Sequence, residues 1–125
     1  MICGIGVDSV EVSRIEKILD RWEKRFTNMV YSSSEIDYCR KQAFPAIHYA
    51  ARFAAKESFF KAAGIGLWKG IRLNDIEILN NRAGKPEIKL RETAKSILQD
   101  TDVTAIYVSL SHTAFLAVAM VILEK

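Results

Sequence analysis

One segment, from Pro45 to Gly64, constrains the fold more than any other part of the sequence. Proline is favoured at the first position of a helix, and glycine is favoured just past its end, where the backbone enters the left-handed region. The segment is therefore predicted to form one long helix around which the rest of the chain is organised. At about 100° per residue, small side chains share one face of this helix and aromatic side chains form a row on another. The small face holds Ile47, Ala50, Ala51, Ala54 and Ser58, and the aromatic row holds Tyr49, Phe53 and Phe60.

Glu57 falls between these two faces, and Lys61 follows one turn later. A carboxylate flanked by small and aromatic side chains is not freely solvated, and a buried acid needs a partner. A metal ion, an ammonium group or a hydrogen-bond donor would each serve. The alternative is that Glu57 and Lys61 form a simple i,i+4 pair that supports the helix.

A second acid lies near the start of the chain. The segment from Ile2 to Asp8 alternates as a strand does, and it places Gly4, Gly6 and Asp8 on one face. Two glycines leave space above that face, as happens where a ligand or another backbone comes close. Asp8 would then stand at the strand end, facing this hollow. Alternatively, Asp8 or Ser9 caps the helix that follows.

That next helix, predicted from Glu11 to Phe26, separates its side chains into three stripes. The apolar stripe is Val12, Ile15, Ile18, Leu19, Trp22 and Phe26, the acidic flank is Glu16, Asp20 and Glu23, and the basic flank is Arg14, Lys17, Arg21, Lys24 and Arg25. Most solvated faces mix their charges to gain i,i+4 pairs. Five cations beside an apolar stripe suggest a docking surface for an acidic partner. A basic solvent face and an RNA contact are the alternatives, although one aromatic residue, Trp22, is few for single-strand stacking.

The remaining segments predict an α+β fold with an antiparallel-rich sheet, a long central helix and a basic amphipathic N-terminal helix. A capping signal at Ser32–Glu35 precedes a short helix, and Asn80–Pro86 is a turn. The expected elements are helices Ile36–Ala43 and Glu92–Gln99, strand Leu73–Leu79, a short strand at Ile88 and Leu90, and strands Thr104–Leu110 and Phe115–Leu123 joined at Ser111–Ala114. His112, at the tip of this last hairpin, is an anion contact or a polar turn residue.

The final strand carries large apolar side chains on both faces. Phe115, Val121 and Leu123 alternate with Leu116, Val118, Met120 and Ile122. Such a strand is usual in a sheet that is covered on both sides. A chain of 125 residues forms one domain, residues 1–125, and has few helices to spare for that cover. A subunit interface is therefore expected to provide part of it.

Composition excludes several classes of protein. The net charge of +3 is too small to mark a nucleic-acid binder, and no apolar stretch is long enough to span a bilayer. Cys3 and Cys39 lack any metal-ligand spacing and suit a reduced cytoplasmic protein. The first residues show no signal peptide.

Four segments together resemble one family. They are Gly4-Ile5-Gly6-Val7-Asp8 continuing to Glu11 and Arg14-Ile15, Phe53-Ala54-Ala55-Lys56-Glu57-Ser58 continuing to Lys61-Ala62, Gly84-Lys85-Pro86, and Ser109-Leu110-Ser111-His112. Their order and spacing resemble the holo-acyl-carrier-protein synthases, the small trimeric group of phosphopantetheinyl transferases. The resemblance covers nearly the whole chain. It departs from the family at Ile65, where Thr is usual, and at Leu73, where Trp is frequent.

The resemblance implies a reaction and a set of sites. The family moves the phosphopantetheine arm of coenzyme A onto a serine of apo acyl carrier protein and releases adenosine 3',5'-bisphosphate. Asp8 and Glu57 match its magnesium ligands, and with Lys61, which matches a phosphate contact, they are the implied catalytic residues. The base that deprotonates the serine could be Glu57 acting through a water. The implied coenzyme A contacts are Arg52, Lys61, Gly64, Lys85, Pro86, Ser111, His112 and Thr113, and the implied carrier contacts are Arg14, Ile18, Arg21, Trp22 and Arg25.

The family also implies a homotrimer with sites at subunit interfaces, without nucleic acid or membrane as a partner. Two rival interpretations remain. One is a non-catalytic trimeric module that binds a nucleotide or RNA and needs neither Asp8 nor Glu57. The other is a metal-dependent phosphoanhydride hydrolase, which would need no protein acceptor.

Overall fold

The computed structural model describes residues 1–64 and 70–125. In chain order the elements are strand β1 (Ile2–Glu11), helices α1 (Val12–Val30), α2 (Ser33–Arg40) and α3 (Pro45–Ala63), a 3-10 turn η1 (Leu73–Asp75), strands β2 (Ile76–Asn80) and β3 (Pro86–Leu90), helix α4 (Glu92–Gln99), and strands β4 (Ala105–His112) and β5 (Leu116–Glu124). The mixture of helices and antiparallel sheets confirms the predicted α+β fold class. None of the helices in the described part of the chain has the length and hydrophobicity needed to cross a bilayer.

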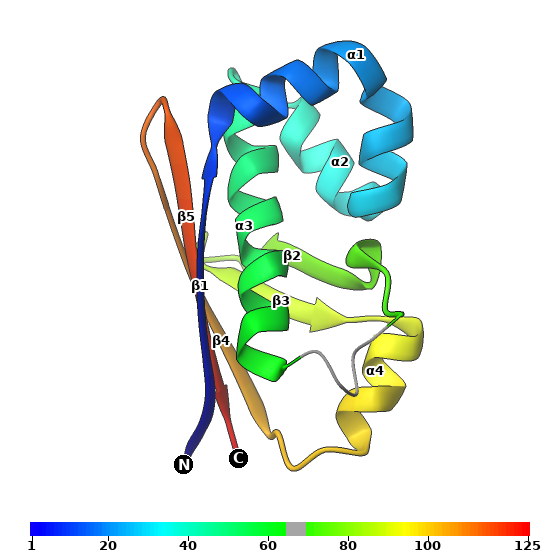
Figure 1. The fold of residues 1–125 in the computed structure, drawn as a ribbon, viewed down its shortest axis with the longest axis vertical. Coiled ribbons are helices and arrows are strands. Elements are labelled where there is room, and N and C mark those ends of the chain that lie inside the picture. Colours follow the sequence, from blue (N-terminus) through cyan, green and yellow to red (C-terminus); the bar gives the residue numbers. More distant parts are fainter. Residues whose placement is uncertain (65–69) are drawn as a thin grey trace.

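Strands β1, β5 and β4 form an antiparallel sheet in that order, and α3 lies along one of its faces (Figure 1). The glycines of β1 allow this close approach. A Cβ atom on Gly6 would overlap the carbonyl oxygen of Ser58, and one on Gly4 would overlap that of Ala62. The space above the glycine face is therefore filled by the backbone of α3. The sequence had predicted that either a ligand or another backbone would come close here. Asp8 is not at the strand end but within β1, which continues to Glu11.

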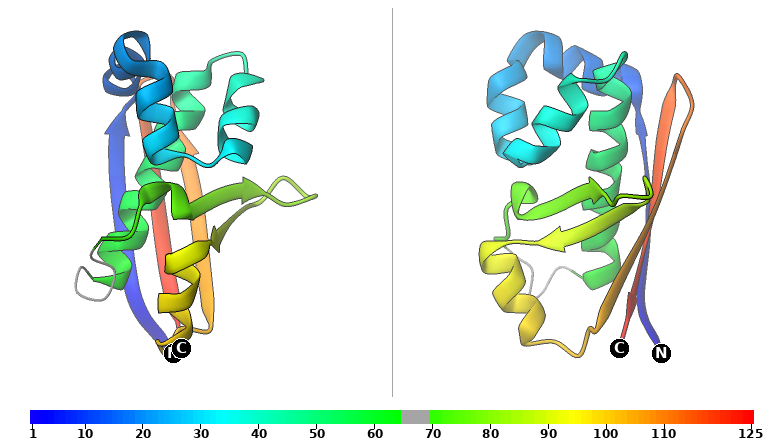
Figure 2. Two further views of the ribbon diagram at one scale, coloured as in Figure 1. Left: turned by 90° about the vertical axis from the view of Figure 1, so that its right-hand side faces the viewer. Right: turned by 180° about the vertical axis from the view of Figure 1, so that it is seen from behind.

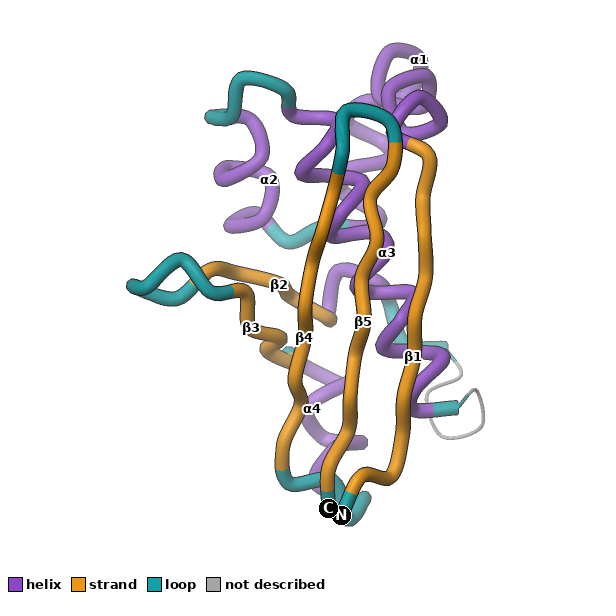
Figure 3. Tube along the Cα trace, turned by 90° about the vertical axis from the view of Figure 1, so that its left-hand side faces the viewer, coloured by secondary structure: helices purple, strands orange, loops and turns teal. Residues whose placement is uncertain are grey.

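The opposite face of this sheet is apolar and bare. No helix covers it in the view that looks onto the strands (Figure 3). Large side chains on this face are at least two-fifths exposed in the chain described here, and they come from all three strands: Ile5, Val7, Tyr107 and Met120. The inward side chains of β5, from Ala117 to Leu123 at every second position, are buried against α3. The structure thus confirms that β5 is apolar on both faces.

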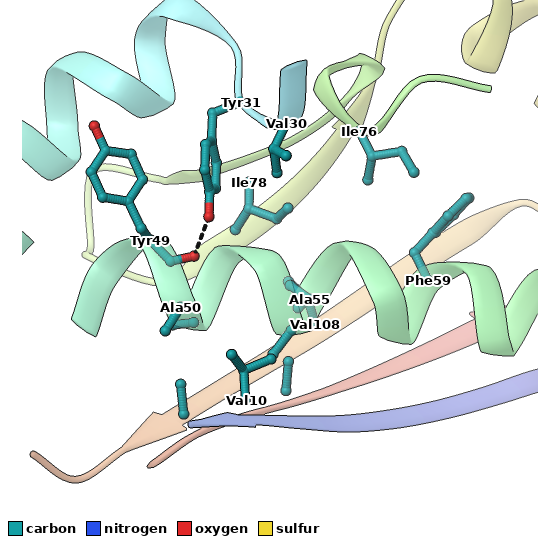
Figure 4. Packing of buried hydrophobic residues seen from close by; sticks show 14 of the residues in the cluster. Val10, Val30, Tyr31, Tyr49, Ala50, Ala55, Phe59, Ile76, Ile78 and Val108 are labelled. Atoms are coloured by element: carbon teal, nitrogen blue, oxygen red, sulfur yellow. Dashed lines mark hydrogen bonds between the residues drawn. The ribbon is translucent and has the colours of Figure 1, made fainter. Parts of the chain in front are cut away.

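The hydrophobic core lies on both sides of α3 and extends from the sheet to the space between this helix, α2 and the β2–β3 hairpin (Figure 4). The rings of Tyr31 and Tyr49 are 4.8 Å apart, and the Tyr31 hydroxyl donates a 2.7 Å hydrogen bond to the backbone carbonyl of Tyr49. Phe59, Ile76 and Ile78 are fully buried beside them. Helix α3 is therefore packed on nearly all sides, which explains why its sequence is so rich in small and apolar residues.

A buried polar network ties α2, α3 and β2 together. The Lys56 ammonium donates to the Glu35 carboxylate at 2.8 Å, to the Leu73 carbonyl at 2.9 Å and to the Ile76 carbonyl. The other carboxylate oxygen of Glu35 accepts a hydrogen bond from the Ile78 N–H. Lys56 and Glu35 are both fully buried. Burial lowers the pKa of Lys56, and the Glu35 carboxylate opposes that shift.

The β2–β3 hairpin lies apart from the main sheet, and its turn projects beyond β4 (Figure 2). The turn at Asn81–Lys85 is closed by the Asn81 side chain, which accepts hydrogen bonds from the N–H groups of Ala83 and Lys85. Gly84 has a φ of +83°, as such a turn requires.

Several predicted boundaries were wrong. Helix α2 begins at Ser33, because Ser32 and Glu35 form a complete capping box one turn before the predicted start. Residues Leu73–Asp75 form η1, so β2 starts three residues later than expected. Strand β4 runs through His112, which is therefore in the strand and not at the hairpin tip. Gly64 has the positive φ expected of a cap, but its ψ of 161° lies outside the left-handed helical region. Ile65 lies outside the described residues.

Candidate active site

Asp8 and Lys61 form a direct ion pair between β1 and α3. The Lys61 Nζ lies 3.0 Å from Asp8 Oδ1 and 3.1 Å from the Val7 carbonyl oxygen. The Asp8 side chain is one-fifth exposed and that of Lys61 about half exposed, so the pair faces solvent and is open to a ligand. Asp8 does not cap α1, because the cap residue is Glu11 and makes no side-chain cap bond.

Glu57 is half-buried on α3, one turn before Lys61. Its carboxylate has no hydrogen bond or ion-pair partner within residues 1–64 and 70–125. The i,i+4 pair with Lys61 considered above is therefore wrong, because Lys61 binds Asp8 instead. A half-buried carboxylate without a partner is a free ligand for a cation. We refer to Asp8, Glu57 and Lys61 as the Asp8 cluster.

The donor set of the Asp8 cluster fits magnesium. Mg²⁺ is usually held by one or two carboxylates together with substrate phosphates and water, and not by a complete protein cage. Asp8 and Glu57 supply those two carboxylates. Among the described residues no group of three or more potential ligand side chains gathers as a metal site would require if the protein alone held the ion. Lys61, beside Asp8, adds a positive charge to the cluster.

A second cluster surrounds Arg52. This side chain is only 2 % exposed, and its Nε and Nη2 have no hydrogen-bond partner among residues 1–64 and 70–125. Its guanidinium carbon lies 4.2 Å from the centre of the Tyr38 ring, which fixes the plane of the group. His48 lies between Tyr38 and His112, with ring centres 5.8 Å from each. We refer to Tyr38, His48, Arg52 and His112 as the Arg52 cluster.

The other predicted coenzyme A contacts lie in three places. Ser111 and Thr113 flank His112 where β4 ends, and the Thr113 hydroxyl accepts hydrogen bonds from the N–H groups of Phe115 and Leu116. Lys85 and Pro86 lie at the β2–β3 turn, near Asn80, whose amide donates to the Tyr38 hydroxyl at 3.1 Å. Gly64 ends α3, where its Cα faces open space.

One chain does not bring the two clusters together. Arg52 and Lys61 are nine residues apart on α3, which at 3.6 residues per turn places them on opposite sides of the helix. The Asp8 cluster lies on the side that meets β1, and Arg52 points to α2.

The predicted carrier contacts lie on α1, which follows β1 directly. Arg14, Arg21 and Arg25 are exposed, and Trp22 is 48 % exposed. The guanidinium groups of Arg21 and Arg25 both lie over the Trp22 ring, at 5.3 Å and 5.9 Å from its centre. A shallow apolar groove beside them is lined by Ile18, Trp22, Arg25, Phe26 and Met29.

Three residues that lie in or beside these clusters in the structure were not predicted from the sequence. His48 and Tyr38 belong to the Arg52 cluster, and Lys56 anchors the helical turn that carries Glu57. His48 could have been found from its i,i+4 spacing to Arg52. No sequence signal links Tyr38 or Lys56 to a site, because their contacts come from tertiary packing.

The fold defines an α+β protein with antiparallel sheets, and comparison with known proteins gives its family. Residues 4–117 match the 4'-phosphopantetheinyl transferase superfamily. A holo-[acyl-carrier-protein] synthase of Syntrophus aciditrophicus is 52 % identical over 124 residues, covering 99 % of this chain and 97 % of that protein. The chain belongs to the 4'-phosphopantetheinyl transferase superfamily, within its holo-acyl-carrier-protein synthases, which confirms the resemblance inferred from the sequence.

Solved structures agree with this assignment. The holo-[acyl-carrier-protein] synthase of Neisseria meningitidis superposes with a TM-score of 0.91 at 30 % identity, covering 100 % of both chains. That of Bacillus anthracis, solved in complex with coenzyme A (3',5'-ADP), superposes with a TM-score of 0.80 at 35 % identity, covering 100 % of this chain and 98 % of the other.

Proposed function

We propose that this single-domain cytoplasmic enzyme transfers the phosphopantetheine arm of coenzyme A to a serine hydroxyl of apo acyl carrier protein. The reaction depends on magnesium and releases adenosine 3',5'-bisphosphate. The observation that carries the proposal is the Asp8 cluster, in which an unpartnered carboxylate, Glu57, lies one helical turn from a Lys61–Asp8 pair. The coenzyme A bound in the Bacillus anthracis relative supports the choice of donor.

Each residue of the Asp8 cluster has a distinct role in this proposal. Asp8 and Glu57 would hold Mg²⁺, and the bound metal would supply positive charge to phosphate oxygens of the donor. Lys61 contacts the same phosphates and stabilises the departing bisphosphate. Glu57 would also accept the serine proton through a water. The serine oxygen forms the new bond to phosphorus, and the bond to the adenosine bisphosphate breaks.

The Arg52 cluster holds the nucleotide end of coenzyme A. Buried, unpartnered guanidinium nitrogens require an acceptor, and a phosphate supplies one with matching charge. His112, Ser111 and Thr113 at the end of β4 flank this position. Lys85 and Pro86 approach it from the β2–β3 turn.

The carrier protein docks on α1. Acyl carrier proteins are acidic, and α1 presents exposed arginines beside an apolar groove. Because β1 runs directly into α1, a partner docked on this helix is close to the strand that carries Asp8. The docking surface and the reacting centre are thus connected through one continuous stretch of chain.

The enzyme works as a homotrimer in which neighbouring subunits complete each site. The two clusters lie on opposite sides of α3, so a bound coenzyme A can meet both only if they come from different subunits. The bare apolar face of the β1–β5–β4 sheet provides the surface for this association. Its outward side chains would contribute about 1.5–3 kcal/mol each on burial.

Intact-mass measurement of apo acyl carrier protein, incubated with coenzyme A and Mg²⁺, tests the function. The carrier should gain one phosphopantetheine group, and removal of the metal with a chelator should stop the reaction until Mg²⁺ is restored. Asp8→Ala and Glu57→Gln should each reduce turnover by at least about a hundredfold and leave the fold intact. Glu87→Gln, an exposed change on β3, is the matched control.

Three results would reject the proposal. Breakdown of coenzyme A at the same rate without carrier protein would indicate a hydrolase. Near-normal turnover by either carboxylate variant would place the metal elsewhere, and full nucleotide or RNA binding without any transfer would support the non-catalytic module.

A further inference from the structure

The Arg52 cluster contains a residue to which neither the sequence nor the comparisons assign a role. His48 lies one turn before Arg52 on α3, so the two side chains occupy the same side of the helix. The ring of His48 meets that of His112 from β4 at 65° and that of Tyr38 from α2 at 77°, both in edge-on contact. Three nitrogen-bearing side chains from two elements therefore gather around one position.

The charges that act on His48 are positive, and the acids Glu16, Asp20 and Glu23 of α1 line a pocket with His112 on the other side of the His48–His112 ring pair. The charged and titratable groups that face His48 are Arg52 on its own helix, His112 from β4 and Tyr38 from α2. Burial, followed by the charges of Arg52 and His112, lowers the pKa of His48, and no carboxylate acts in the opposite direction. A dianion bound between these side chains would remove the repulsion that keeps the imidazole neutral.

The buried guanidinium shows that a ligand belongs here. Almost all buried polar groups in folded proteins have a hydrogen-bond partner. Arg52 Nε and Nη2 have none within the described residues, although the side chain is almost fully buried. The cation–π contact with Tyr38 is not a hydrogen bond, so it leaves these two nitrogens without an acceptor.

We propose that His48 is a specificity-determining residue of this enzyme, which acts with Arg52 and His112 to bind the ribose phosphate of coenzyme A and thereby discriminates coenzyme A from dephospho-coenzyme A. The inference rests on the proposed function, because it concerns the donor of that reaction. A phosphomonoester has three acceptor oxygens and a second pKa of about 6. Its binding draws a proton onto His48, which then donates a charge-assisted hydrogen bond.

Kinetics with two donors test the proposal. His48→Phe keeps a ring of similar size against Tyr38 and His112 but removes the donor. It should lower kcat/KM for coenzyme A by about tenfold or more, mainly through KM, because a charge-assisted hydrogen bond is lost. The same variant should change kcat/KM for dephospho-coenzyme A by less than about twofold, since that donor lacks the phosphate. Lys95→Ala, which removes an exposed positive charge on α4, is the control for general electrostatics.

Calorimetry gives a readout that does not depend on turnover. Adenosine 3',5'-bisphosphate and adenosine 5'-monophosphate differ by the phosphate in question. The wild-type protein at about pH 7.5 should take up more protons on binding the bisphosphate than on binding the monophosphate, and His48→Phe should lose that difference. His48→Gln, which restores a neutral donor, should recover part of the affinity but none of the proton uptake.

The outcomes separate this inference from the proposed function. If the wild-type enzyme transfers nothing from coenzyme A to the carrier, the proposed function fails. If it transfers normally but His48→Phe affects both donors equally, or neither, the role of His48 is wrong. Equal proton uptake for the two nucleotides in the wild-type protein would also overturn it, even if no His48 variant folds.

Discussion

Single buried side chains between α2 and α3 make the stability of this protein sensitive to alkaline pH. Cys39 is fully buried, and desolvation raises the pKa of its thiol from 9.0 to about 12. Burial likewise raises the pKa of Tyr49 to about 12 and that of Tyr31 well above its usual range. A group whose pKa is raised by folding keeps its proton in the folded state after the unfolded chain has lost it. The stability that it contributes is complete below the unfolded pKa and is lost as pH rises toward the folded one.

Cys39→Ala should therefore flatten the alkaline loss of stability. Above pH 9, the raised pKa of Cys39 should lower the wild-type free energy of unfolding by about 1.4 kcal/mol for each pH unit, in addition to the effects of other groups. The variant is less stable at pH 8, because it leaves a small cavity, but the two curves should converge as pH rises to 11. Urea unfolding at a series of pH values measures this. Cys3→Ala, at an exposed position, is the control. Its free energy of unfolding should depend on pH as that of the wild type does, and the same result for Cys39→Ala would contradict the prediction.

Among the elements, α1 was predicted correctly in its amphipathic pattern but not in its kink or its full length. Its three stripes predicted an amphipathic helix, and Arg14, Arg21 and Arg25 are exposed as expected. The kink at Trp22, where φ is −136° and ψ is 31°, was not predicted, nor was the extension of the helix to Val30. A helical wheel assumes an unbroken 3.6-residue period, and no glycine or proline marks this bend.

For the other elements too, features set by the local sequence were predicted and features set by tertiary contacts were not. Helix α4 begins and ends at the predicted residues, and the Pro45 and Gly64 signals gave the bounds of α3. Local chemistry was sufficient there, because caps and proline act within one turn. The pairing of Asp8 with Lys61, by contrast, joins residues from distant parts of the chain. The sequence predicted that Asp8 and Lys61 belong to a site. It could not show that Lys61 forms its ion pair with Asp8 and not with Glu57.

On α1, Arg21→Glu should weaken docking of the carrier protein and leave binding of coenzyme A unchanged. We expect the apparent KM for carrier protein to rise at least about tenfold, because a charge reversal adds repulsion to the lost attraction, whereas Arg21→Ala should have a smaller effect. The wild-type KM for the carrier should also rise with ionic strength. Steady-state kinetics with each substrate varied in turn measure this, with Lys95→Glu as the control reversal on α4. An equal rise in both KM values would show that α1 binds the nucleotide or is only structural.

For the whole molecule, the arrangement of the two clusters and the bare sheet support one assembly. Their separation on α3 follows from the nine-residue spacing of Arg52 and Lys61, but the contacts of Arg52 with Tyr38 and of Lys61 with Asp8 could not be foreseen, because they come from tertiary packing. The apolar outer face, in contrast, was visible in the alternation of β5, because a period of two assigns every second side chain to each face. We propose that the same face holds the trimer together and completes the sites.

Met120→Glu should therefore dissociate the trimer and abolish transfer. Three copies of a carboxylate would be buried in an apolar interface, at a cost of several kcal/mol. Light scattering should report a monomer for this variant and a trimer for Lys89→Glu, an exposed change on β3. Co-expression of two inactive variants, Arg52→Gln and Glu57→Gln, should restore part of the activity, since some sites would receive an intact residue from each neighbour. A fully active monomer, or no recovery in the mixture, would contradict shared sites.

The pairing of β1 with β5 also bears on how this chain can be made. These strands come from the two ends of the described chain, with Ile2 opposite Glu124, and β5 is the middle strand of the sheet. A ribosome delivers β1 well before its partner β5, because every other element lies between them in the sequence. Neither β1 nor β4 can enter this sheet until β5 has emerged, so α3 has only an incomplete surface to pack against during synthesis. The sheet that carries Asp8 therefore forms only after β5 has been synthesised. Until then β1 is an unpaired strand that is exposed to non-native contacts.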